Sequence, residues 1–90
     1  IHKSLHIYAA SDAGLMMENL MLSAHAHGLG TCAQGAVSFW DDAVREEFEI
    51  SKDYRLLCGI AIGYPSTSPV NSFGAHRIGL DELLFKAKKR

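Results

Sequence analysis

The residue types best suited to metal chemistry are two histidines and a cysteine near the middle of the chain. His25, His27 and Cys32 all belong to types that ligate metal ions. On a helix, residues two positions apart point away from each other, so His25 and His27 cannot easily share one ion. No basic residue adjoins Cys32 to activate it as a redox thiol. We therefore expect no metal site, and an inert thiol at Cys32.

Arg77 and an aromatic pair are the next candidates for binding a small molecule. Arg77 lies in a polar, irregular stretch, residues 66–79, that is long for an inert connection. No acidic residue adjoins it, which favours a ligand role over a surface ion pair. Phe39 and Trp40 allow two interpretations: an aromatic ring here either stacks on a substrate ring or anchors the next helix. The sequence alone does not choose between them.

A long apolar helix is predicted over residues 7–27. Apolar groups cover most of its circumference, which indicates a buried helix and not a surface one; they are Leu15, Met16, Leu20, Met21, Leu22, Ala24 and Ala26. In so small a protein, such a helix is central or forms a dimer seam. We therefore expect the helix to be mostly buried, with Leu20 and Ala24 facing protein. Gly28 follows as the usual residue past a helix C-terminus.

The remaining elements are shorter. Residues 29–37 predict a short strand followed by a tight loop. Residues 41–48 predict a helix capped by Asp41 or Asp42. The near-continuous apolar run of residues 54–64 predicts a central strand covered on both faces and ended by Pro65. Residues 80–88 have the charge order of a helix, and Lys86, Lys88, Lys89 and Arg90 follow as solvated charges near its C-terminus.

Composition limits the classes of function. Ninety residues allow one domain at most, and 48% hydrophobic residues are more than so small a core can hide, so a partner or further protein must cover the excess. A net charge of −1 argues against a nucleic-acid partner. No apolar run approaches the roughly 20 residues of a membrane span. Two widely separated cysteines are typical of a reduced, cytoplasmic protein, although an oxidising compartment allows them to pair.

Three sequence blocks together resemble the nitroreductase family. The first begins with Asp12-Ala13-Gly14 and ends with Gly28-Leu29-Gly30-Thr31-Cys32. The second is Cys58-Gly59-Ile60-Ala61-Ile62-Gly63-Tyr64-Pro65. The third starts at Pro69-Val70-Asn71, continues through Arg77 and ends at Leu80-Asp81-Glu82. Each block alone is short, but their order and spacing over most of the chain make the combination fairly specific.

The resemblance implies an α+β fold in which helices pack on a small mixed or antiparallel sheet, with the central helix at a dimer interface. Residues 1–90 would form the C-terminal half of a single FMN-binding domain. The implied protein is a homodimer that reduces nitro compounds, quinones or similar acceptors with NADH or NADPH by a ping-pong route. Because the flavin carries the chemistry, no catalytic side chain is expected.

The resemblance also assigns cofactor-binding residues. Cys32, Ala33, Gln34 and Gly35 match the loop whose backbone N–H groups point at the reactive edge of the flavin. Gly35 lacks a Cβ, so the backbone there can approach a flat ring closely. Arg77 matches the arginine on the FMN phosphate, where a guanidinium makes paired, charge-assisted bonds.

One departure and one missing part leave a second hypothesis open. Where many family members carry a lysine or another polar residue, two positions before Arg77, this chain has Ala75. The family's N-terminal phosphate motif lies outside these residues. The alternative is therefore a non-enzymatic remnant or dimerisation module that binds no flavin. Flavin absorption in the purified protein distinguishes the two hypotheses.

Overall fold

The long apolar stretch near the start of the chain forms helix α1 (His6–Ala26) in the computed structural model, which describes residues 1–89. Gly28 follows the helix and its C-cap His27, and its φ of +77° lies in the left-handed region that glycine adopts without a steric penalty. The amide of Leu29 then donates to the carbonyl of Ala24 at 2.9 Å, which closes the last turn. The predicted helix over residues 7–27 is confirmed to within one residue at each end.

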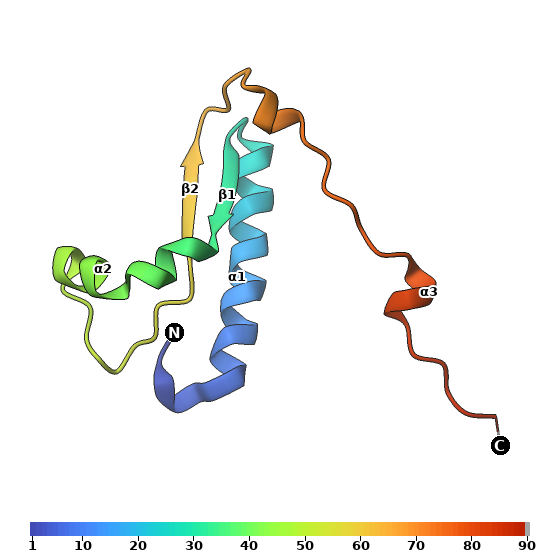
Figure 1. The fold of residues 1–90 in the computed structure, drawn as a ribbon, viewed down its shortest axis with the longest axis horizontal. Coiled ribbons are helices and arrows are strands. Elements are labelled where there is room, and N and C mark those ends of the chain that lie inside the picture. Colours follow the sequence, from blue (N-terminus) through green and yellow to red (C-terminus); the bar gives the residue numbers. More distant parts are fainter. Residues whose placement is uncertain (90) are drawn as a thin grey trace.

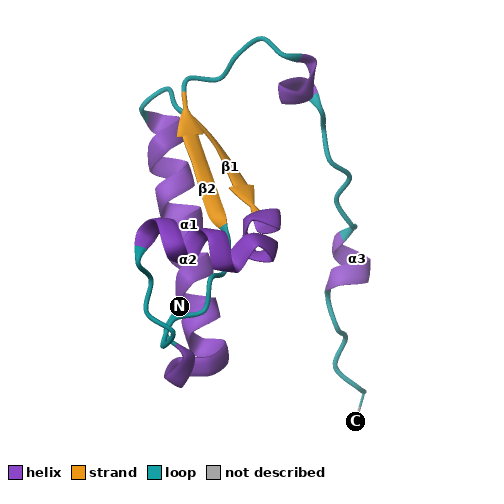
Figure 2. Cartoon of the chain, turned by 60° about the vertical axis from the view of Figure 1, so that its left-hand side comes forward, coloured by secondary structure: helices purple, strands orange, loops and turns teal. Residues whose placement is uncertain are grey.

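Two short strands form an antiparallel sheet that lies against α1 (Figures 1 and 2). Strand β1 (Gly30–Gln34) pairs with β2 (Gly59–Gly63), in a register that runs from Gly30 opposite Gly63 to Gln34 opposite Gly59. The chain therefore has the predicted α+β architecture, with helices packed on a small antiparallel sheet.

The connection between the strands carries the second substantial helix. A 3₁₀ turn, Gly35–Trp40, follows β1 directly and leads into α2 (Asp41–Phe48). The predicted helix over residues 41–48 is confirmed, but its predicted cap is wrong. No side chain caps the N-terminus of α2, because Trp40 occupies the N-cap position and Asp41 and Asp42 lie within the first turn. After α2 the chain passes through an irregular segment to β2, and residues 1–3 run beside residues 53–55 through an isolated bridge between His2 and Tyr54.

The second predicted strand is shorter and more exposed than expected. Within residues 54–64 only Gly59–Gly63 are paired as β2, and Tyr54 makes just the bridge to His2. The prediction of a central strand covered on both faces is wrong for this chain. A sheet of two strands has no central strand, and α1 covers only one face of it. The apolar run therefore has more surface than the described residues can cover.

The C-terminal region leaves the sheet as an extended arm, residues 64–89 (Figure 1). It contains a 3₁₀ turn, Pro69–Ser72, and a single helical turn, α3 (Leu80–Leu83). The predicted helix over residues 80–88 is wrong beyond Leu83, because an isolated short helix without a packing partner is only marginally stable. Lys86, Lys88 and Lys89 therefore follow α3 at a distance, and Arg90 lies outside the described residues. The arm raises the radius of gyration to 17.2 Å, against about 12 Å for a compact chain of this length.

Little of the described chain is buried. Only Ala9 and Ala24, both on α1, are buried, at 6% and 7% exposed. Ala24 faces protein as predicted, but Leu20 is 38% exposed and most of α1 is open to solvent. The prediction of a mostly buried helix is therefore wrong within the single chain, because one narrow sheet covers only one side of α1. None of the helices in residues 1–89 has the length and apolar character needed to cross a membrane.

Candidate functional site

The segment predicted to bind the flavin ring is mostly strand and not loop. Cys32, Ala33 and Gln34 belong to β1, and Gly35 begins the 3₁₀ turn. The prediction of a loop over these four residues is wrong because β2 supplies pairing partners as far as Gln34. Within the described residues β1 pairs along one edge only, so its other edge presents backbone N–H and C=O groups without a strand partner.

The space beside Gly35 suits the close approach of a flat molecule. A Cβ added to Gly35 would meet no atom within 4 Å, so its backbone faces open space. The hydroxyl of Ser38 donates to the Gly35 carbonyl at 2.8 Å, which holds the turn from inside and leaves the strand edge free. Cys32 is exposed and makes only a weak contact, 3.7 Å from its Sγ to the Ala33 carbonyl. The segment therefore has the geometry to accept a ring edge.

Arg77 lies on the arm, apart from this segment. Its guanidinium donates only to carbonyls of its immediate neighbours, at 3.3 Å to Ala75 and 3.2 Å to His76. In both views of the ribbon the arm runs away from β1 and α1 (Figures 1 and 2). The structure thus brings Cys32, Ala33, Gln34 and Gly35 together but does not bring Arg77 to them. The open space beside Gly35 leaves room for a flat ring, whereas Arg77 lies apart from it within the described residues.

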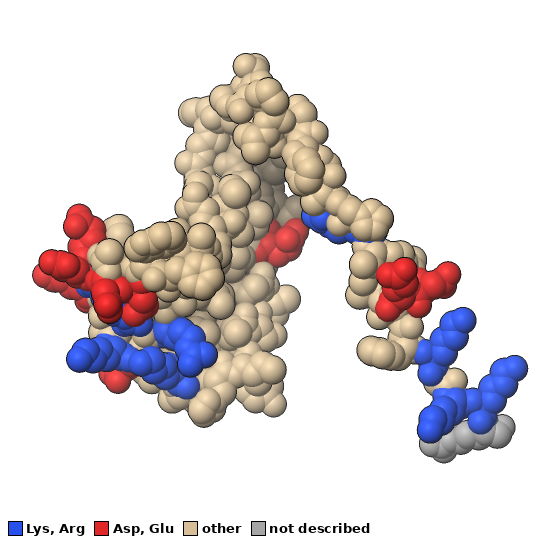
Figure 3. All heavy atoms as spheres, viewed as in Figure 1, with Lys and Arg blue, Asp and Glu red and all other residues tan. Residues whose placement is uncertain are grey.

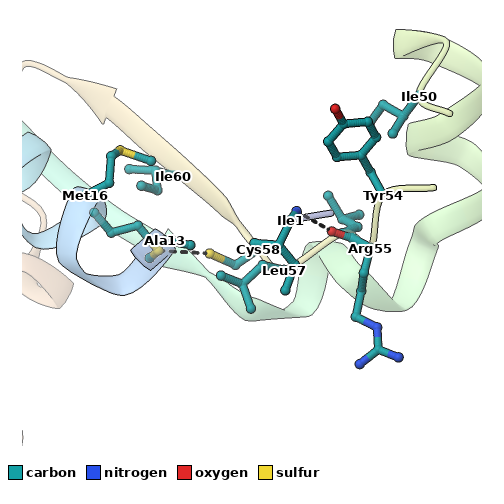
Figure 4. Close-up of a pocket in the computed structure, with 11 residues that line it drawn as sticks. Ile1, Ala13, Met16, Ile50, Tyr54, Arg55, Leu57, Cys58 and Ile60 are labelled. Atoms are coloured by element: carbon teal, nitrogen blue, oxygen red, sulfur yellow. Dashed lines mark hydrogen bonds between the residues drawn. The ribbon is translucent and has the colours of Figure 1, made fainter. Parts of the chain in front are cut away.

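An apolar hollow of about 340 Å³ lies between α1 and the segment that leads into β2 (Figure 4). Met17 and Cys58 meet in it, with 3.7 Å between Sδ and Sγ. Arg55 is the one charged side chain among the described lining residues, and it points away from the other labelled side chains. The surface of the hollow suits packing against another apolar surface. A shallower hollow of about 280 Å³ lies over the paired strands and includes Cys32.

Arg45 organises the connection between the strands. It lies on α2 with its side chain 18% exposed, and it binds three different groups. Its Nε donates to the Asp41 carboxylate at 2.6 Å, and its two terminal nitrogens donate to the carbonyls of Ser51 at 2.9 Å and Tyr54 at 2.6 Å. Our sequence analysis did not identify Arg45. The acid–base pair four residues apart, Asp41 and Arg45, is the signal that marks it.

Phe39 and Trp40 do not anchor α2 within this chain. Both rings stand out from the turn that follows Gly35, at 84% and 64% exposed. Of the two interpretations that the sequence allowed, anchoring the helix is thus not realised in the described residues. Both rings are open to contact with another molecule, and both follow Gly35 shortly along the chain.

Charge is distributed away from the strands. Acidic and basic side chains gather around α2 and on the arm, whereas the viewed face over β1, β2 and the adjoining part of α1 carries few of them (Figure 3). Among residues 1–89, no three His, Cys, Asp or Glu side chains cluster in a way that would hold a metal ion. His27 uses its Nδ1 to donate to the Ser23 carbonyl at 2.8 Å.

Comparison with known proteins finds a protein family whose model matches the part of the chain that contains α1 and both strands. The model of the nitroreductase family matches residues 2–64. Nitroreductase NfnB of Mycolicibacterium smegmatis is 40% identical over 74 residues, covering 81% of this chain and 31% of the relative. A 4-nitrobenzoate reductase of a Nocardioides species is 33% identical over 82 residues, covering 90% of this chain and 33% of the relative. A chloronitrobenzene nitroreductase of Comamonas testosteroni is 33% identical over 71 residues, covering 78% of this chain and 31% of the relative. The chain thus spans about a third of the length of these relatives.

Proposed function

This chain belongs to the nitroreductase family, and from that premise we propose that it is the C-terminal part of an FMN-dependent oxidoreductase that reduces nitro groups with NADH or NADPH. The match of the family model to residues 2–64 carries the proposal. Relatives named for the reduction of nitrobenzoate and chloronitrobenzene support an aromatic nitro compound as the acceptor. Quinones are further candidate acceptors.

The overall reaction balances as a two-electron reduction. The nicotinamide gives up a hydride, a proton is taken from water, and the nitro group becomes a nitroso group with release of one water molecule. FMN, when bound, supplies the hydride chemistry. The protein then has to bind and orient the reactants.

The ring-edge segment, Cys32–Gly35, is our candidate for the flavin ring. Its free strand edge and the open space beside Gly35 support this role. Backbone N–H donors at that edge would favour negative charge on the reduced ring. Arg77 is the candidate for the phosphate, because its guanidinium is exposed and binds only neighbouring carbonyls, so its donors are available to an anion.

We propose further that residues 1–90 are part of one FMN-binding domain and that this domain works as a homodimer. Most of α1 is exposed in the single chain, and the arm presents apolar side chains to solvent along its whole length. Surfaces of this kind are normally covered by more protein. The arm holds Arg77 away from the ring-edge segment, and we propose that protein outside the described residues completes the phosphate site.

Purification of the full-length protein tests the proposed function. We expect the protein to carry equimolar flavin, and NADH or NADPH to be consumed in step with reduction of 4-nitrobenzoate. Mass spectrometry of the released flavin identifies FMN. A purified full-length protein that neither carries nor binds FMN would favour the alternative, a dimerisation module without enzymatic activity.

A further inference from the structure

The connection between β1 and β2 is held at two separate places, one against the sheet and one within the connection itself. The place near β1 is formed by the pairing of Gln34 with Gly59 and by Val37, which lies directly over Gly59. A Cβ added to Gly59 would stand 3.3 Å from Cγ2 of Val37, so the turn packs against the start of β2 without a gap. This contact keeps Gln34 and Gly35 in place without help from α2.

At the second place, the hydrogen bonds are made by the side chain of Arg45. By bonding to the carbonyls of Ser51 and Tyr54, the guanidinium ties α2 to the segment that leads into β2. By bonding to Asp41, it fixes the first residue of α2, which directly follows Trp40. A guanidinium is suited to this task because its planar fork reaches several acceptors at once, which a lysine does not.

Phe39 and Trp40 lie between these two places. Within the described residues neither side chain makes a hydrogen bond and both rings are largely exposed, so their positions depend on what holds the backbone on each side. On the β1 side that is the contact of Val37 with Gly59, and on the α2 side it is Arg45. Removing Arg45 should therefore release the aromatic pair but leave the Gln34–Gly35 backbone in place.

We propose that Phe39 and Trp40 form a contact surface for the aromatic acceptor and that Arg45 is the positioning residue that holds this surface beside the ring-edge segment. The proposal rests on the proposed function, since it assumes that an aromatic nitro compound reacts next to Gly35. Offset or edge-to-face contact between aromatic rings gives such a surface its selectivity for ring-bearing acceptors.

The test uses the full-length, flavin-loaded protein with Arg45→Met and Arg45→Lys, and Lys52→Met as the control. Lys52 lies in the same connection, is exposed and makes no side-chain hydrogen bond or ion pair in the described residues, so Lys52→Met removes a charge without breaking such a contact. Oxidation of the reduced protein is followed with 4-nitrobenzoate and, separately, with dioxygen, which has no ring. Hydrogen–deuterium exchange of peptides from residues 36–48 and an FMN titration complete the set.

In Arg45→Met we expect the rate constant for 4-nitrobenzoate to fall roughly 3- to 10-fold, the loss of a typical ring–ring contact. The rate with dioxygen and the FMN affinity should stay within about twofold of wild type, and exchange should rise in residues 36–48 but not in β1. Arg45→Lys should fall between Arg45→Met and wild type, and Lys52→Met should match wild type.

Two results would overturn the proposal, and they differ from failure of the proposed function. Unchanged exchange over residues 36–48 in Arg45→Met would show that Arg45 does not hold the aromatic pair. An equal loss with 4-nitrobenzoate and dioxygen would show a general structural role. A wild-type protein that carries flavin and consumes NADH or NADPH but reduces no nitroaromatic compound would instead reject the proposed function itself.

Discussion

Residues 1–63 and the arm, residues 64–89, are both rich in apolar side chains but use them in different ways. In the first region α1 packs on the sheet, and the buried residues Ala9 and Ala24 lie there. In the arm every described residue is exposed, including Tyr64, Phe73 and Phe85. The first region has neighbours to pack against and the arm has none. An apolar side chain therefore stabilises the fold only where the topology brings a second element to it.

The largest expected effect concerns the isolated chain, where both regions are present but the rest of the domain is absent. Residues 1–90 alone should bind FMN at least roughly 100-fold more weakly than the full-length protein, because at least two charge-assisted phosphate contacts are missing. Calorimetric titration of both proteins measures the difference. Submicromolar affinity of the isolated chain would show that the arm and the sheet assemble a complete site by themselves.

The next largest effect is expected from a substitution that tests whether the exposed side of α1 contacts a second subunit. Leu20→Asp should cost several kcal/mol of assembly free energy, because a half-exposed leucine that becomes buried against a partner would be replaced by a desolvated charge. Light scattering of the full-length protein gives the mass. Ser11→Asp, which adds the same charge at an exposed polar position of α1, is the control. An unchanged dimer mass in Leu20→Asp would count heavily against α1 as the seam.

The arm is tested through its arginine. In the full-length protein, Arg77→Ala should weaken FMN binding roughly 10- to 150-fold, the range for one lost charge-assisted contact, and should leave thermal stability nearly unchanged. Lys88→Ala removes a charge elsewhere on the arm and serves as the control. Equal FMN affinity in Arg77→Ala and wild type would remove Arg77 from the site and would leave the arm with a packing role only.

The smallest expected effect is a change in the stability of residues 1–63, at the end of α2. Glu49 follows α2 in the left-handed conformation at φ +50°, which costs a residue with a Cβ about 1 kcal/mol relative to glycine. Glu49→Gly should therefore stabilise the protein by up to about 1 kcal/mol, whereas Glu47→Gly, within α2, should destabilise it by about the same amount. Urea unfolding of both variants should give shifts of opposite sign. Shifts of the same sign would show that helix propensity and not the backbone conformation of Glu49 controls this end of α2.

The sequence predicted the elements that depend on local pattern. Helices α1 and α2 follow from apolar spacing and from Gly28, and their ends agree with prediction to within one residue. The predictions that failed depend on neighbours. The strand over residues 54–64 is paired only where β1 lies opposite it, and the helix after Gly79 stops at Leu83 because nothing packs against it. Burial of α1 and β2 also depends on which other elements pack against them, and the pattern of apolar residues does not reveal this.

In the candidate site, too, the features set by local sequence were predicted and those set by neighbouring elements were not. The ring-edge segment was located by its resemblance; Cys32, Ala33 and Gln34 lie on β1, and Gly35 begins the turn that follows. The short strand and tight turn predicted over residues 29–37 are confirmed, but pairing with β2 continues through Gln34, where the resemblance implied a loop. Arg45 was missed because two of its three partners are backbone carbonyls, which leave no trace in residue type. Arg77 remains a prediction, since the described residues do not bring it to β1.

The contacts of Arg45 also bear on the order in which the chain folds. Pairing Gln34 with Gly59 closes a long loop. Closing a loop of this size costs about 3 kcal/mol in chain entropy, and this cost precedes any stabilisation from strand pairing. Helix α2 forms from local contacts, and the bonds from Arg45 to Ser51 and Tyr54 then fold the second half of that loop back on the first. Consequently, the part of the loop that is still flexible is shorter when the two strands pair. The guanidinium thus lowers the entropic barrier to a sheet in which it takes no part.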